Sequence, residues 1–219
     1  MNVLCPMSDV TGLCRRGFIW LLGYFFMSSG FIVEPNMPKD LGQRTVDSGQ
    51  QKIYLGSGNI AGLGKIEVAA TDLGVCAIAL PKWNDHDLRL QAWVAAGFQV
   101  MRAKHPLIEQ ALAELRAYAQ GSCLTFSVAL DLRYLPTFTE RVLVTLLLVP
   151  AGQLLTYGQL AAKAGSPNAA RAVGGAVGRN PIPVIVPCHR VVASNGIGGF
   201  GLGLPCKRAL LAMEDIHLD

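Results

Sequence analysis

The feature that most restricts the possible folds is a change of sequence pattern at Pro136. Before it, residues 63–71 and 75–80 have the apolar pattern of two strands in a hairpin, and residues 124–132 predict a further strand. Residues 106–120 are apolar at helical spacing. After Pro136 the patterns are helical. We therefore expect an α+β protein, in which a small α/β part precedes a mostly helical part.

Three regions follow from this change of pattern. Residues 1–56 are expected to be an N-terminal extension and linker, because residues 34–56 are polar and rich in Pro, Gly, Asp and Gln. Residues 57–135 form the predicted α/β domain, and residues 136–219 form the predicted helical domain. The apolar fraction of 51% is enough for a substantial core, and the charged fraction of 16% argues against a disordered chain.

One N-terminal stretch, residues 17–33, carries no charge and follows two arginines. A membrane-spanning helix needs about 17–25 such residues, and a signal peptide has a similar core. The alternative is an N-terminal extension that the two predicted domains do not need in order to fold or function. The six cysteines are scattered and form no C-x-x-C pair, so neither a disulfide framework nor a metal site is expected. These features favour a cytoplasmic or nuclear protein, with targeting or anchoring by residues 17–33 as the alternative.

Two helix starts are predicted in the helical region. Thr137 or Thr139 is expected to cap a helix over residues 141–149. Residues 156–159 (Thr-Tyr-Gly-Gln) have the sequence of a capping box, in which the Thr hydroxyl and the Gln side chain close the first turn of a helix. That helix is expected to run through Ala164.

A second short helix should follow at once. Gly165 ends the first one, and residues 166–167 (Ser-Pro) predict the start of another that runs to about Arg179. This spacing is typical of a helix-turn-helix, although an ordinary helical hairpin has the same pattern. Small residues dominate the second helix: Ala169, Ala170, Ala172, Gly174, Gly175, Ala176 and Gly178. They indicate that another backbone, either a protein strand or a nucleic-acid groove, comes close to this helix.

Charge is distributed unevenly in this region. From Arg141 to Met213 there are seven Lys and Arg residues and no Asp or Glu, and the next carboxylate is Glu214. A basic face of this kind is expected of a protein that binds the phosphate backbone. A merely soluble surface is the alternative.

Cys188 and His189 stand side by side at the end of an apolar run, residues 182–188, that predicts a buried extended segment. Cys188 is either a buried structural thiol or a nucleophile with a nearby base. Neighbours on an extended segment point apart, so a water would carry the proton between them. The basic surroundings should favour the thiolate. Glu214 could fix the imidazole tautomer, or it could be a solvated helix end.

A glycine-rich segment follows the cysteine. Residues 196–201 match G-x-G-x-x-G, but only 18 residues remain after Gly201, and a dinucleotide site needs an acidic residue about 20 positions further on. We instead expect a flexible lip over a pocket, with Phe200 at its tip.

These residues together resemble the O6-alkylguanine-DNA alkyltransferases (methylated-DNA–protein-cysteine methyltransferases), which repair DNA directly. The similarity is continuous over residues 136–217 and weaker over residues 60–130. Its motifs are Thr156-Tyr157-Gly158-Gln159-Leu160-Ala161, Ala170-Arg171-Ala172-Val173-Gly174, Asn180-Pro181, Val186-Pro187-Cys188-His189-Arg190-Val191, and Lys207 with Leu210-Leu211 and Glu214.

The resemblance implies a ribonuclease H-like N-terminal domain and a winged-helix DNA-binding domain. It implies that Cys188 accepts the alkyl group once and irreversibly, that His189 withdraws the thiol proton through a water, and that Glu214 holds His189. Asn180 would order the segment that bears the cysteine. Tyr157 would crowd the 3′ phosphate and help to rotate the base outward.

The resemblance also implies a surface and a pocket. Arg171 would fill the gap in the base stack, and the small helix would lie in the minor groove; the implied DNA-contacting residues are Arg171, Tyr157, Ala170, Gly174 and Arg179. The implied pocket residues are Phe200, Gly199, Gly201, Lys207 and Val191. The partner would be double-stranded DNA containing O6-alkylguanine, and the protein would act as a monomer with neither cofactor nor metal. O4-alkylthymine stays open as a second substrate.

The sequence departs from relatives at Phe200, where many carry Tyr, and residues 1–50 have no counterpart. Two other functions stay open. An alkyltransferase-like protein would bind the lesion without transfer, and a winged-helix regulator would keep Cys188 merely buried. The intact Cys188 motif favours the transferase.

Overall fold

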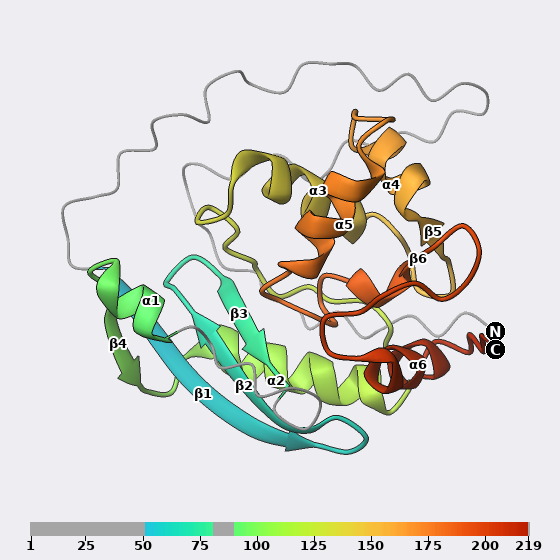
Figure 1. The fold of residues 1–219 in the computed structure, drawn as a ribbon. Helices are drawn as coiled ribbons and strands as arrows, with labels where there is room; N and C mark the ends of the chain where they lie inside the picture. The colour runs from blue at the N-terminus through green and yellow to red at the C-terminus, as the bar shows by residue number, and fades with distance from the viewer. Residues whose placement is uncertain (1–50, 81–89, 219) are drawn as a thin grey trace, which may run out of the picture. The chain divides into compact units, whose positions relative to one another are not determined.

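A computed structural model describes residues 51–80 and 90–218 of the chain (Figure 1). Residues 17–33, the apolar stretch, lie outside the described residues. Within the described ranges, no helix is both long and apolar enough to cross a membrane. The described residues belong to one compact unit. We call residues 51–80 and 90–135 the sheet half and residues 136–218 the helical half. The domain boundary at residue 136 stays a prediction.

The sheet half contains a four-stranded sheet in the order β3-β2-β1-β4. The predicted hairpin is confirmed, because β2 (Gly64–Ala70) pairs antiparallel with β3 (Val75–Ala79). The other neighbour of β2 is β1 (Lys52–Ile60). This strand begins inside residues 34–56, so the prediction of a linker that extends to residue 56 is wrong. β4 (Gln99–Arg102) pairs parallel with β1 and follows a short helix, α1 (Leu90–Ala95).

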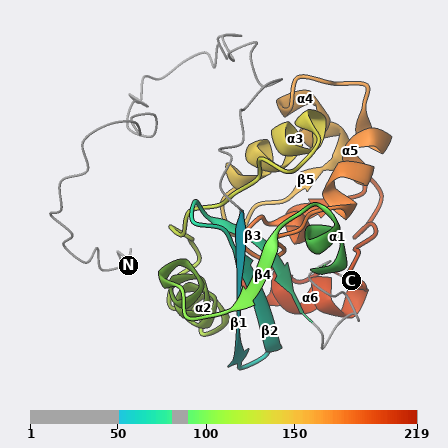
Figure 2. The same cartoon turned by 90° about the vertical axis from the view of Figure 1, so that its left-hand side faces the viewer.

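The predicted helix of this half is α2 (Pro106–Ala119), which lies along one side of the sheet (Figure 2). Its apolar side chains at helical spacing are buried: Ile108, Ala111, Leu112, Leu115 and Tyr118. Burial of this stripe is what stabilises most helices in proteins.

The strand predicted over residues 124–132 is wrong. The segment forms only an isolated bridge between Leu130 and Val75. The backbone N–H groups of Ser127 and Val128 instead donate to the Glu114 carboxylate at 3.0 and 3.2 Å. Because a side chain uses these donors, the segment cannot continue a ladder.

The helical half holds α3 (Thr137–Leu147), α4 (Tyr157–Lys163), α5 (Ala170–Gly178) and α6 (Leu204–Ala212). Two short strands of this half, β5 (Leu155–Thr156) and β6 (Val191–Val192), pair in parallel (Figure 1). Helices α3, α4 and α5 pack on one another. Gly165 has φ +71° in the turn between α4 and α5, a conformation that favours glycine.

The helix starts test the predicted caps. The capping box is confirmed: Gln159 N donates to Thr156 Oγ1, and Thr156 N donates to Gln159 Oε1. The cap of α3 is Pro136 without a side-chain bond, so the expected caps at Thr137 and Thr139 are wrong.

The second helix of the pair starts later than expected. Ser166 does not cap α5, which begins at Ala170. The hydroxyl of Ser166 instead accepts from Arg141 Nη2 at 3.3 Å, so it is not directed at the amides of a helix end.

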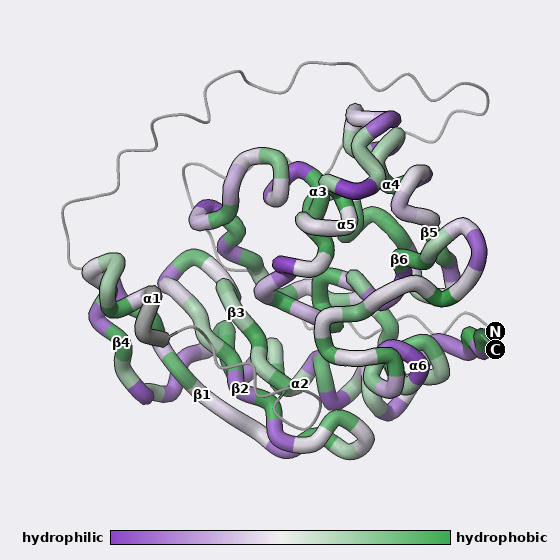
Figure 3. The backbone as a smooth tube through the Cα atoms, in the orientation of Figure 1, coloured by the Kyte–Doolittle hydropathy of each residue, from purple (hydrophilic) through white to green (hydrophobic). Residues whose placement is uncertain are grey.

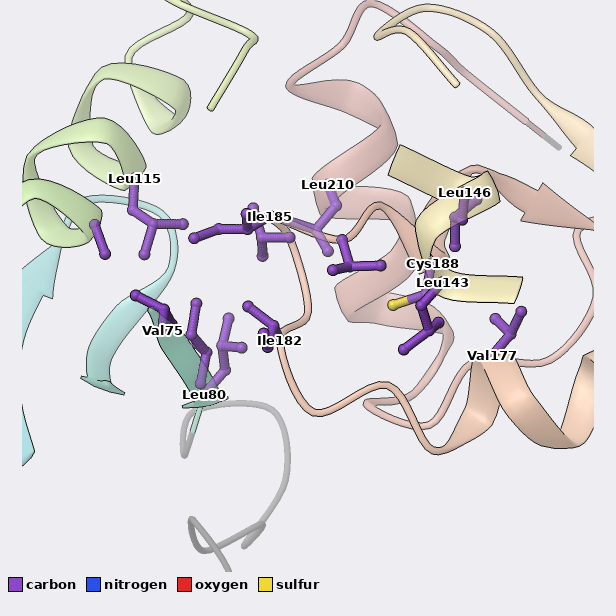
Figure 4. Close-up of a cluster of buried hydrophobic side chains, with 14 of the residues drawn as sticks. Val75, Leu80, Leu115, Leu143, Leu146, Val177, Ile182, Ile185, Cys188 and Leu210 are labelled. Atoms are coloured by element: carbon purple, nitrogen blue, oxygen red, sulfur yellow. The ribbon is translucent and has the colours of Figure 1, made fainter. Parts of the chain in front are cut away.

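One hydrophobic core joins the two halves. It runs from β2, β3 and α2 into α3, α5 and the segment before Cys188. Figure 3 shows that β3 is hydrophobic along its length. A smaller cluster with Phe98 covers the other face of the sheet. In Figure 4 the Cys188 sulfur lies between Leu143 and Val177 on one side and Ile182 on the other, and Cys188 belongs to the main core.

Candidate active site

The segment that carries the cysteine is a compact loop. The extended run predicted for residues 182–188 is wrong: Val184 has φ 75°, and Cys188–Arg190 is one turn of 3-10 helix (η1). Prolines at 181, 183 and 187 remove backbone donors that a strand would need. The Asn180 side chain closes the loop, since its Nδ2 donates to Val186 O at 2.9 Å and its Oδ1 accepts from Ile182 N at 3.0 Å.

Cys188 is 6% exposed. Burial raises the pKa of its thiol to about 11, although the Asn180 side chain and the charge of Lys207 act in the opposite direction. The expectation that basic surroundings favour the thiolate at rest is therefore wrong, because desolvation outweighs them. The thiol needs a base to become a nucleophile at neutral pH.

His189 and Glu214 form a fully buried pair, with Nε2 and Oε1 2.7 Å apart. Burial by itself would raise the pKa of the Glu214 carboxyl, but hydrogen bonds from His189 and Arg190 lower it to about 2. Burial lowers the pKa of His189 despite the neighbouring carboxylate. The resting pair is thus a neutral imidazole beside a carboxylate, both inside the core.

This pairing determines where the imidazole carries its proton. An ionised carboxylate only accepts hydrogen bonds, so the proton is on Nε2 and Nδ1 keeps its lone pair. Nδ1 is buried and has no hydrogen-bond partner among the described residues. An unprotonated ring nitrogen of this kind is a proton acceptor.

Two members of this buried cluster were not predicted from the sequence. Arg190 binds Glu214 through two bonds of 2.9 Å, from Nε to Oε2 and from Nη2 to Oε1. The Tyr118 hydroxyl donates to Glu214 Oε1 at 2.7 Å. Arg190 adjoins His189 in sequence, which is a usable signal. Tyr118 lies in the sheet half and looks like any other apolar helix position.

A cavity of about 630 Å³ opens in front of the cysteine. Its lining includes eight of the residues predicted for the site: Cys188, Tyr157, Asn180, Gly174, Arg179, Gly199, Phe200 and Gly201. The Tyr157 hydroxyl lies 3.4 Å from Gly199 O, and burial raises the pKa of this tyrosine, so it stays protonated. The sheet half contributes Trp93, Phe98 and Tyr134 to the wall.

Lys207 and Val191, both predicted as pocket residues, do not line this cavity. The Lys207 ammonium is fully buried and donates to Val191 O at 2.5 Å and to Ile197 O at 2.6 Å. Burial lowers its pKa to about 8. Lys207 therefore fastens the glycine-rich loop to β6.

Helix α5 presents small residues to solvent. Arg171 is exposed on its first turn next to Ala170, and neither lines the cavity. A Cβ added at Gly178 would meet no atom within 4 Å, and one at Gly175 would meet only the Arg179 guanidinium. Packing inside the protein does not explain these two glycines.

Metal ligands were expected to be absent. Within residues 51–80 and 90–218, no group of three or more His, Cys, Asp or Glu side chains could hold an ion. Cys5 and Cys14 lie outside the described residues.

Comparison with known proteins shows which family this chain resembles. The sequence profile described as "6-O-methylguanine DNA methyltransferase, DNA binding domain" matches residues 137–216. The methylated-DNA–protein-cysteine methyltransferase of Mycobacterium tuberculosis (strain H37Rv) is 49% identical over 105 residues, which are 48% of this chain and 63% of the relative. The chain thus spans less than two thirds of that relative's length. The rat protein of the same name is 38% identical over 167 residues, 70% of this chain and 78% of the relative.

The fold has solved counterparts. A crystal structure of Mycobacterium tuberculosis OGT in complex with DNA has a TM-score of 0.63 and 32% identity, and the match covers 74% of this chain and 93% of that chain. The O6-methylguanine-DNA methyltransferase of the archaeon Pyrococcus kodakaraensis has a TM-score of 0.52 and 28% identity, with 75% of this chain and 99% of that chain covered.

Proposed function

Because the chain belongs to the O6-methylguanine-DNA methyltransferase family, we propose that it repairs DNA by moving an alkyl group from O6-alkylguanine onto Cys188. One observation carries the proposal: a buried thiol faces a cavity and is followed by a histidine whose tautomer a buried carboxylate sets. O4-alkylthymine, which presents the same alkyl–oxygen bond, belongs to the same substrate class.

The chemistry follows from these groups. His189 Nδ1 takes the Cys188 proton through a water, and the imidazolium stays paired with Glu214. The thiolate attacks the alkyl carbon, the carbon–oxygen bond breaks, and guanine leaves with the electrons of that bond. The guanine takes a proton from the Tyr157 hydroxyl, which solvent reprotonates at once, and His189 releases to solvent the proton that it took from Cys188. The product is a thioether on Cys188. None of the described residues around Cys188 would hydrolyse a thioether, so each molecule acts once.

The thiol pKa of about 11 makes this proton transfer necessary. At neutral pH a free thiolate would be rare, which protects the resting protein from other electrophiles. The hydrogen bond from Asn180 lowers the thiol pKa and would stabilise the charge as it forms.

The partner in this proposal is double-stranded DNA, bound by a monomer. The site cannot reach an atom inside a duplex, so the nucleotide is rotated into the cavity. Gly175 and Gly178, which packing inside the protein does not explain, support a close approach of α5 to the minor groove. In finer terms, we propose that residues 136–219 form a winged-helix domain, in which α4 and α5 are the helix-turn-helix, and that residues 57–135 form a ribonuclease H-like domain.

The test uses an oligonucleotide with radiolabelled O6-methylguanine. The full chain should take up the label, and digestion should place it on the peptide with Cys188. Cys188→Ser should abolish uptake, and Cys123→Ser should leave it unchanged. Binding of the lesion by intact protein without uptake would support an alkyltransferase-like lesion binder and reject the transferase.

Arg171 tests base rotation separately. We expect Arg171→Ala to slow repair of duplex substrate much more than reaction with free O6-benzylguanine, which needs no rotation. Arg116→Ala removes an equal charge from the exposed side of α2 and should affect neither reaction. Equal losses with both substrates would contradict the role of Arg171.

A further inference from the structure

Tyr118 joins the two halves of the protein at the buried acid–base pair. It lies near the end of α2 and is fully buried. Its hydroxyl oxygen is 2.7 Å from Glu214 Oε1, 3.4 Å from His189 Nε2 and 3.3 Å from Leu210 O. The sheet half thus supplies a polar group to a cluster whose other members belong to the helical half.

The hydroxyl can only donate to the carboxylate. Burial first, and then the charge of Glu214, raises the pKa of Tyr118, so the phenol keeps its proton. The 2.7 Å contact is the shortest of the three and takes that proton. Because the phenol keeps its proton, Tyr118 is not an acid or a base in the reaction.

Three donors converge on Glu214 Oε1: Tyr118 Oη, His189 Nε2 and Arg190 Nη2. The other oxygen, Oε2, accepts from Arg190 Nε at 2.9 Å and from Gly152 N at 3.3 Å. Each donor withdraws negative charge from the carboxylate. The strength with which Glu214 stabilises a protonated His189 therefore depends on how many other donors share Oε1.

We infer that Tyr118 is a positioning residue for alkyl transfer: its hydroxyl holds Glu214 Oε1 in line with His189 Nε2 and tunes the basicity of His189. The inference rests on the proposed function, but its central effect can be measured on His189 without any substrate. Through this contact the sheet half would take part in the chemistry, in addition to packing against the helical half.

The test compares Tyr118→Phe with the wild type. Loss of the hydroxyl leaves Oε1 with fewer donors and more negative charge, which favours the imidazolium. In ¹⁵N NMR titrations of the histidine ring, wild-type His189 should carry its proton on Nε2, and in Tyr118→Phe its pKa should rise. In a plot of the rate of label uptake against pH, the rise on the acid side (the acid limb) should move to higher pH. The maximal rate should nevertheless fall about tenfold, which corresponds to about 1.4 kcal/mol, because Oε1 is no longer held in line with His189 Nε2.

A matched control is Tyr54→Phe, which also removes one hydroxyl in the sheet half. Tyr54 lies on β1 and stacks on His105, with ring centroids 4.4 Å apart. This variant should leave both the His189 titration and the acid limb where they are. A merely structural Tyr118 would lower the unfolding midpoint without moving either pH-dependent property.

A second substitution guards against a variant that fails to fold. Site-specific 3-fluorotyrosine at position 118 keeps the ring and strengthens the hydroxyl as a donor, so the His189 pKa and the acid limb should move to lower pH, opposite to Tyr118→Phe. An unchanged His189 titration in a folded variant would overturn the inference. Absence of label uptake in the wild type would overturn the proposed function instead, and the NMR result would still stand.

Discussion

The loop that carries Cys188 should depend on a single side chain, Asn180. Asn180→Ala removes two hydrogen bonds, of 2.9 and 3.0 Å, and leaves Val186 O and Ile182 N without these partners. Both of these residues are fully buried. A buried polar group that loses its partner costs about 1–3 kcal/mol. Asn180 itself is only half-buried and water reaches part of the site, so we expect a total of about 2–4 kcal/mol.

The assay is urea unfolding followed by fluorescence. With a slope of about 2 kcal/mol per molar for a chain of this size, the midpoint should fall by about 1–2 M. Because the Asn180 side chain also lowers the thiol pKa, the rate of label uptake in the folded variant should fall about tenfold.

Asn59→Ala is the matched control, since Asn59 is exposed on β1. It should change stability by less than about 0.5 kcal/mol and leave the uptake rate unchanged. If Asn180→Ala behaved like Asn59→Ala in both assays, the account of the loop would be wrong.

Two further predictions concern stability. The Glu214 carboxyl has a pKa of about 2 against an ordinary 4.5, so its ionisation should contribute about 3 kcal/mol to the free energy of unfolding. This contribution is fully present above about pH 4.5 and is lost as the pH falls through 2. In thermal unfolding, the melting temperature should therefore fall more steeply at acid pH in the wild type than in Glu214→Gln, and an equal fall in both would contradict the assignment. Thr156→Ala removes the capping box of α4 and should destabilise the protein by about 1 kcal/mol in urea unfolding, whereas Ser57→Ala, at an exposed position of β1, should have almost no effect.

Local rules predicted the elements that depend on local interactions. The hairpin of β2 and β3, helix α2 and the capping box at Thr156 each follow from spacing within a few residues. Two of the errors occur where a distant side chain competes for backbone groups or for a cap. Glu114 takes the amides of residues 127 and 128, and Arg141 engages the Ser166 hydroxyl. Neither competition can be read from a short window of sequence.

In the candidate site, too, local sequence motifs could be recognised, whereas features that depend on distant packing could not. The Cys188, His189 and Asn180 motif could be recognised from sequence, and the cavity lining includes most of the residues predicted with it. The pKa of the thiol could not be predicted, because it depends on how deeply the core buries Cys188. Tyr118 could not be predicted either, since 96 residues separate it from Glu214 and only the packing of α2 brings them together.

The most direct test of the account is the stoichiometry and location of the transferred group. The full chain is incubated with excess duplex that contains O6-methylguanine, and its peptides are then weighed by mass spectrometry. We expect one methyl group per molecule, on Cys188 alone, with no further repair once that thiol is consumed, while Cys76 and Cys206 stay unmodified. Repeated turnover, or a methyl group on another residue, would contradict it.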